Sequence, residues 1–319
     1  MNRKPKIFIS KCIELDSCRW NGAKISSVEV KNILPHIELI TACPEADIGL
    51  GIPREPIRIV AVNDEKRLIQ PATEVDLTEK MQTYCNKLVE DYDDIDGFIL
   101  KSKSPSCGIK EVKVYQGKGS KSPHPAGAGI FAEIVLDKFS HLPIEDEGRL
   151  TNFKIREHFL TSVFTINRFK ELKQNPDIKA LMKFQAEHKF LFLAYNQSQM
   201  RKLGKIAANL EKNNINQVFQ DYQTNLYAVF AKLPRHNNII NVWNHIQGFF
   251  SDHLKPVEKK YLLEKIEAFK NDKLPAIAVT EILHAHAIRF ENEYILNQFF
   301  FTPFPKELIS YFDSGKRKL

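Results

Sequence analysis

Cysteine is scarce in this 319-residue chain, which contains five, and no two of them form the C-x-x-C pair of a zinc knuckle. An odd number of cysteines favours metal ligands or a reactive thiol over a disulfide framework. Apolar runs of membrane-spanning length are missing, and no secretory apolar segment precedes the first strand-like run at Lys6. We therefore expect a cytoplasmic protein without a membrane partner.

Charge is distributed unevenly along the chain. Residues 1–150 contain 21 Lys and Arg against 23 Asp and Glu, whereas residues 151–319 contain 25 against 16. The net charge of +7 therefore comes entirely from the second half, which carries +9. A basic excess confined to one region indicates a polyanionic partner, for which RNA is our hypothesis; a solvated basic surface is the simpler alternative.

Three of the cysteines follow strand-like apolar runs, in residues 6–12, 37–43 and 97–107. Cys12, Cys43 and Cys107 come at or shortly after the ends of these runs. Ligands of an open parallel sheet bind at the carboxyl ends of its strands, so we expect the three thiols to meet at one sheet edge.

Predicted strands alternate with predicted helices up to residue 150, which indicates an α/β fold with a mainly parallel, Rossmann-like sheet. After residue 150 the apolar residues recur with a helical period, and no strand-like alternation of any length follows. The chain is long enough for two hydrophobic cores. We predict an α/β domain over residues 1–150 and an all-α domain over residues 151–319, whose last long helix runs from residue 290 to 301.

Two kinds of metal site suit three cysteines. Three thiolates and a water could hold zinc, or the thiolates could hold a 4Fe-4S cluster that has one iron not bound by protein. The cysteines are 31 and 64 residues apart, without a local knuckle, and this spacing favours the cluster.

The first half contains several short motifs beside the three cysteines. They are Ser10-Lys-Cys12, Arg19-Trp-Asn-Gly22, Cys43-Pro-Glu45, Gly49-Leu50, Pro53-Arg54, Lys103-Ser-Pro-Ser-Cys-Gly108 and Gly129-Ile-Phe-Ala132. Together these motifs resemble those of the thiouracil desulfidase family, whose members hold a 4Fe-4S cluster through three cysteines. The departures are small: Trp20 where tyrosine is usual, and Leu15 and Ile48 where glycine is usual.

Four segments of the second half carry a second resemblance: residues 187–190, 203–204, 245–250 and 298–305. They resemble the helical domain fused to a subset of these proteins, which are implicated in removing sulfur from 4-thiouridine in tRNA. Gln185 replaces a usual histidine and Phe249 a usual tyrosine.

The resemblance implies a role for each motif residue. Cys12, Cys43 and Cys107 would bind the cluster, whose open iron would polarise a C–S bond while water replaces the sulfur. Glu45 would shuttle protons, and Ser104 or Ser106 would hydrogen-bond the base or the water. Candidates for substrate or phosphate contacts are Arg19, Arg54 and Lys103 in the first half and Lys189, Arg201, Lys202 and Lys205 in the second. The expected partner is thiolated tRNA, with no DNA.

The residues leave alternatives open. Free 2-thiouracil could be the substrate, or the protein could bind RNA without catalysis and use its metal or cluster to stabilise the fold. Glu45 could serve only as an ion-pair partner of an arginine. Cys18 could be a spare ligand, and the glycine-rich residues 117–129 could contact a phosphate or form a lid. Cys85 is expected in an apolar core.

Overall fold

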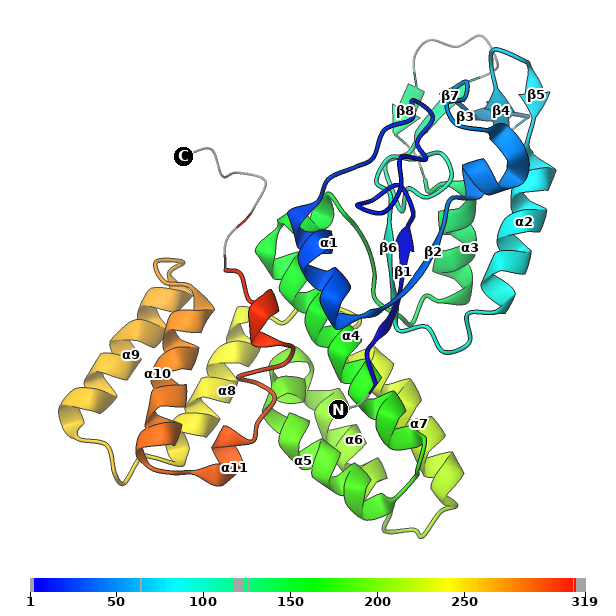
Figure 1. Ribbon diagram of the computed structural model, residues 1–319. Helices are drawn as coiled ribbons and strands as arrows, with labels where there is room; N and C mark the ends of the chain where they lie inside the picture. The colour runs from blue at the N-terminus through cyan, green and yellow to red at the C-terminus, as the bar shows by residue number, and fades with distance from the viewer. Residues whose placement is uncertain (1–2, 64, 117–122, 126, 312, 314–319) are drawn as a thin grey trace. The chain divides into compact units, whose positions relative to one another are not determined.

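The computed structural model describes residues 3–63, 65–116, 123–125, 127–311 and 313 of the chain (Figure 1). The chain divides into two compact units, one formed by Met1–Val163 together with Glu307–Leu319, and the other by Phe164–Lys306. The sequence-based division at residue 150 falls within the first unit, shortly before helix α4 (Phe153–Lys173).

The first unit is built on a four-stranded parallel sheet in the order β2-β1-β6-β9. The central strands β1 (Lys6–Ser10) and β6 (Gly97–Leu100) are almost continuously apolar and buried, as expected of strands covered on both faces. They are flanked by β2 (Glu38–Ala42) and β9 (Ile144–Asp146). The prediction of an α/β fold with a parallel sheet is confirmed, and the three strands that precede the cysteines are present.

Helices cover both faces of this sheet. Figure 1 shows α2 (Thr78–Glu90) and α3 (Ile130–Lys138) on one side and α1 (Val28–Ile33) on the other. Aromatic rings fill the layer beneath α3, where the rings of Phe131 and Phe8 lie 5.1 Å apart between centroids. The sheet edge that carries the cysteines is therefore fixed by a core packed on two sides.

A second, mixed sheet in the order β5-β4-β3-β7-β8 was not expected as a sheet. The sequence predicted β3 (Arg58–Val62), whose run is apolar. The other strands are short and mostly polar, so their sequences carry no clear alternation of apolar residues. They are β4 (Glu65–Gln70), β5 (Val75–Asp76), β7 (Lys113–Gln116) and β8 (Pro123–Pro125).

The described residues of the second unit are helical, which confirms the all-α prediction. No described helix in either unit is both long enough and apolar enough to cross a membrane. After the second part of α4, the helices are α5 (Ile178–Tyr195), α6 (Gln197–Ala208), α7 (Ile215–Val229), α8 (His236–Gly248), α9 (Pro256–Lys270), α10 (Ala276–Arg289) and α11 (Glu293–Leu296).

The predicted helix over residues 290–301 is wrong, because α10 ends at Arg289 and α11 contains four residues. Glu291 adopts a left-handed backbone conformation with φ 49°, which interrupts the helical path. The Asn292 side chain then accepts a hydrogen bond from the Ile295 amide and starts the new helix. The apolar pattern continues through this break, which is why it resembled one helix.

Candidate active site

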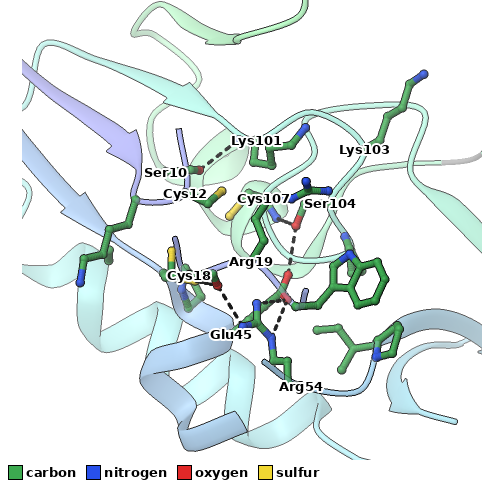
Figure 2. A pocket seen from close by; sticks show the side chains of 18 of the residues that line it. Ser10, Cys12, Cys18, Arg19, Glu45, Arg54, Lys101, Lys103, Ser104 and Cys107 are labelled. Carbon is green, nitrogen blue, oxygen red and sulfur yellow. Dashed lines mark hydrogen bonds and ion pairs between the residues drawn. The ribbon is translucent and has the colours of Figure 1, made fainter. Parts of the chain in front are cut away.

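The three predicted ligand cysteines line one cavity of about 390 Å³ at the carboxyl edge of the parallel sheet. Cys12 follows β1, Cys43 follows β2 directly, and Cys107 lies on the loop after β6. The pairing of Ser10 with Ala42 brings the ends of β1 and β2 level. Cys18 lines the same cavity, so the structure brings four thiols together. Figure 2 labels three of these cysteines, Cys12, Cys18 and Cys107.

Cys43 is held by the short helical turn η2 (Ala46–Leu50) that follows it. The Asp47 carboxylate accepts a hydrogen bond of 3.0 Å from the Cys43 amide. The same oxygen accepts one of 2.7 Å from the hydroxyl of Tyr84 on α2. The first turn after β2 is therefore tied to a helix of the core, which fixes the position of the thiol.

The loop that carries Cys107 is held by hydrogen bonds within its own turn and by hydrogen bonds from α3. The Ser104 hydroxyl oxygen accepts hydrogen bonds of 3.1 Å from the amides of Ser106 and Cys107. The first turn of α3 packs on this loop, and the Ala132 amide donates to the Ser106 carbonyl at 3.1 Å. A Cβ at Gly129 would lie 2.5 Å from that carbonyl oxygen, so this approach requires glycine.

We expect Gly129→Ala to destabilise the first unit by about 1–3 kcal/mol, because the new methyl group overlaps backbone that cannot yield. Displacement of the loop should also lower the metal content at Cys107. Thermal unfolding and metal analysis measure the two effects. Gly248→Ala is the matched control, because a Cβ there meets no atom within 4 Å and should leave both quantities unchanged. Equal behaviour of the two variants would contradict the packing argument.

Glu45 lies at the centre of a network of hydrogen bonds (Figure 2). Its Oε1 accepts from the hydroxyls of Ser104 at 3.2 Å and Ser106 at 3.1 Å. Its Oε2 accepts from Arg54 Nη2 at 2.7 Å, in an ion pair whose arginine side chain is 3% exposed. Arg54 Nη1 also donates to the Cys18 carbonyl at 3.0 Å. Arg54 thus connects Glu45 to the Cys18 loop.

Burial dominates the electrostatics of the thiols. It raises the pKa of Cys12 to about 12, an effect that the neighbouring Cys43 reinforces and the Lys101 ammonium opposes. Burial also raises the pKa of Cys107 well above its usual value, while a hydrogen bond with Ser10 acts in the opposite direction. These thiols become thiolates when a cationic centre compensates for the lost hydration, so metal binding here displaces protons.

The cavity lining also contains residues that were not predicted as site residues, among them Ser10, Lys101 and Trp20. The Ser10 hydroxyl accepts a 3.0 Å hydrogen bond from the Lys101 amide and so joins β1 to the loop after β6. The Lys101 ammonium pairs with Glu147 at 2.5 Å. A serine that ends a buried apolar strand is the signal that could have identified Ser10. Trp20 is 45% exposed. The sequence feature that could have identified it as a site residue is its place in a family motif, where it replaces the usual tyrosine.

The residues of the first half that were predicted to contact phosphate differ in their partners. Arg54 is occupied by Glu45 and the Cys18 carbonyl. Arg19 and Lys103 also line the cavity, and neither has an ion-pair partner among the described residues. Of the glycine-rich residues 117–129, positions 117–122 and 126 lie outside the described part of the chain.

The basic residues predicted in the second half belong to the second unit and do not line this cavity. Lys189 lies on α5, and Arg201, Lys202 and Lys205 lie on α6. All four are exposed, and none has an ion-pair partner within the residues that the structure describes.

Comparison with known proteins identifies the first unit. The sequence profile of a family described as 2-thiouracil desulfurase matches residues 7–147, a range that contains all the cavity cysteines and Glu45. The chain belongs to the 2-thiouracil desulfurase family. A second profile, of the DUF1722 family of proteins of unknown function, matches residues 189–305.

Individual proteins are similar to parts of this chain. The uncharacterized protein YbbK of Bacillus subtilis (strain 168) is 32% identical over 136 residues, which are 40% of this chain and 88% of YbbK. The uncharacterized protein YbgA of Escherichia coli (strain K12) is 22% identical over 149 residues, 46% of this chain and 88% of YbgA. The solved structure of the 4Fe-4S-dependent thiouracil desulfidase TudS matches 46% of this chain and 93% of its own, with 22% identity and a TM-score of 0.38.

Proposed function

We propose that this protein is an iron–sulfur-dependent desulfidase that removes sulfur from thiolated uracil, with 4-thiouridine in tRNA as the substrate. The observation that carries this proposal is the cavity itself. Cysteines from the ends of three parallel strands line it, together with a glutamate that is hydrogen-bonded to two serines. A metal that only stabilised the fold would need neither the cavity nor the glutamate. The family to which the chain belongs supports thiouracil chemistry.

The donor set of the cavity fits a 4Fe-4S cluster. Its described lining contains four cysteines, one glutamate and no histidine, which is a soft, sulfur-rich set. Within the part of the chain that the structure describes, no group of three His, Cys, Asp or Glu is arranged to hold a single metal ion. Cys12, Cys43 and Cys107 would hold the cluster and leave one iron without a protein ligand.

In the proposed mechanism water replaces sulfur at the ring carbon, sulfide leaves, and no electrons are transferred to or from the base. The bound cluster would supply a soft Lewis acid for the thiocarbonyl group. Glu45 Oε1 would take a proton from the attacking water, and the hydroxyls of Ser104 and Ser106, which donate to this oxygen, would orient the water or the base. Arg54 keeps the carboxylate directed at the cavity through its bond to Oε2.

The charge of the second half supports tRNA as the partner, because a free base requires no polyanion-binding surface. We expect the triple variant Arg201→Ala, Lys202→Ala, Lys205→Ala to bind tRNA more weakly than the wild type. Its slope of log affinity against log salt should be smaller by roughly 0.7–0.9 for each phosphate that the variant no longer neutralises. Filter binding at two salt concentrations measures both quantities.

The matched control removes three exposed lysines from the first unit, in the variant Lys24→Ala, Lys31→Ala, Lys113→Ala. Both triple variants lose the same net charge, so a general charge effect would weaken them equally. That result would contradict a phosphate-binding surface on α6.

Free 2-thiouracil is the second candidate substrate, because the family profile carries that name. Protein purified without oxygen distinguishes the candidates in one experiment. We expect a brown preparation with about four irons per chain that bleaches in air. It should release sulfide from 4-thiouridine tRNA faster than from 2-thiouracil at equal concentration. A colourless preparation with stoichiometric zinc would refute the cluster, and turnover restricted to 2-thiouracil would refute the tRNA substrate.

A further inference from the structure

Two aromatic rings lie exposed side by side on the second unit. Phe249, which follows the last residue of α8, is 44% exposed, and Tyr294 on α11 is 39% exposed. The two rings are stacked, with centroids 5.6 Å apart and an angle of 29° between their planes. Exposed aromatic side chains are costly to leave in water, so a stacked pair of them indicates a contact surface.

The pair rests on a rigid support. The buried ring of Phe190 on α5 meets Phe249 and Tyr294 edge-on, with centroid distances of 6.2 Å in both cases. The Gln298 side chain fixes the same region, because its amide nitrogen donates to the carbonyls of Ala186 at 2.9 Å and Tyr294 at 3.2 Å. The two exposed rings are therefore pre-organised, and a ligand that stacks on them loses little free energy to ordering the protein.

Positive charge adjoins the rings. The Lys189 ammonium lies 5.9 Å from the ring centroid of Phe190, the residue beneath the pair, and is exposed. His245 is exposed one helical turn before Phe249. Glu293 is exposed beside Tyr294, so the surface is not uniformly basic. A flat aromatic face with a cation at its margin suits an unpaired nucleobase and the phosphate next to it.

Residues far apart in the sequence form this surface. Residues 187–190, 245–250 and 298–305, which carry the resemblance of the second half to a helical domain, meet around the pair through Phe190, Phe249 and Gln298. None of them lines the cysteine cavity. The catalytic proposal therefore leaves this group of residues without a role.

We propose that Phe249 and Tyr294 form a stacking platform for an unpaired base of RNA, with Lys189 contacting the adjoining phosphate. This inference rests on the proposed RNA partner and goes beyond it by naming the element of RNA that is bound. Stacking is tolerant of sequence because every base has an aromatic face. Double-stranded RNA offers no free face except at its ends, so the platform selects single-stranded segments such as loops.

Fluorescence anisotropy with the full-length protein tests the platform. The probes are unmodified tRNA, a short single-stranded RNA, and the same RNA annealed to its complement. We expect Phe249→Ala and Tyr294→Ala each to weaken binding of the single strand about tenfold and binding of the duplex by less than twofold. Phe249→Tyr and Tyr294→Phe should retain wild-type affinity, because both keep a ring that can stack.

Tyr261→Ala is the matched control. Tyr261 lies on α9, is 50% exposed, and has the Lys265 ammonium 4.7 Å from its ring centroid, so it is another exposed aromatic residue beside a lysine. It should bind the single strand like the wild type. Thermal unfolding of all variants checks that the half-exposed positions tolerate alanine.

Four other results would overturn the stacking platform. Wild-type affinity in both alanine variants would overturn the platform and leave the proposed desulfidase function in place. Equal weakening in Tyr261→Ala, or equal weakening for duplex and single strand, would also overturn it. If the wild-type protein binds none of the three RNA probes, the platform and the proposed tRNA partner fail together, while activity on a free thiobase would still support the cavity chemistry.

Discussion

Cys43→Ala protein purified without oxygen is expected to lack an iron–sulfur cluster and to be inactive. Cys43 follows β2 directly, and the hydrogen bond from its amide to Asp47 fixes its position at the edge of the cavity. The proposed ligand set then retains only Cys12 and Cys107, which cannot hold a cluster that three thiolates bind. Iron and sulfide analysis with a visible spectrum measures the loss, and Cys12→Ala and Cys107→Ala should behave in the same way.

Two other cysteines provide the controls. Cys85 lies on α2, is fully buried and does not line the cavity, so Cys85→Ala should keep the full cluster. Cys18→Ala should also keep it, because the proposed ligand set excludes Cys18 although the structure places it in the cavity. Loss of iron from Cys18→Ala would make Cys18 a ligand. An intact cluster in Cys43→Ala would show that the ligand set is misassigned.

Glu45→Ala is expected to retain the cluster and to lose turnover by a factor on the order of 10²–10⁴, the range for removal of a general acid–base group. The carboxylate lies in the cavity with the hydroxyls of Ser104 and Ser106 on one oxygen, a position from which it can exchange a proton with water. Sulfide release from 4-thiouridine tRNA, compared with the iron content of the same sample, measures the effect.

A second substitution is needed to separate the catalytic role of Glu45 from its ion pair with Arg54. Alanine leaves the Arg54 guanidinium, which is 3% exposed, without its anion, and an uncompensated buried charge can destabilise a protein by about 3–5 kcal/mol. Glu45→Gln keeps hydrogen-bonding oxygen and nitrogen atoms at this position but cannot take up a proton. We expect its turnover to fall as far as that of Glu45→Ala. Wild-type turnover in Glu45→Gln would show that Glu45 serves only to hold Arg54.

The sequence determined the features that depend on neighbouring residues. The apolar runs before Cys12, Cys43 and Cys107 specify β1, β2 and β6. Strands joined by helices then pair in parallel, which places the loops after these strands at one edge of the sheet. The change to a helical period of apolar residues after residue 150 likewise distinguishes the all-α region from the α/β domain. Each of these features follows from local periodicity, which a sequence displays directly.

The tertiary structure alone decided which side chains meet. Glu45 accepts hydrogen bonds from Ser104 and Ser106, which are 59 and 61 residues away in the sequence. Arg54 donates hydrogen bonds to Glu45 and to the Cys18 carbonyl. The sequence pattern likewise did not predict the second sheet or the break before α11. Such contacts depend on the packing of distant segments, such as the approach of α3 to the Cys107 loop. Local periodicity reports which face of an element is buried and carries no information about which segment covers it.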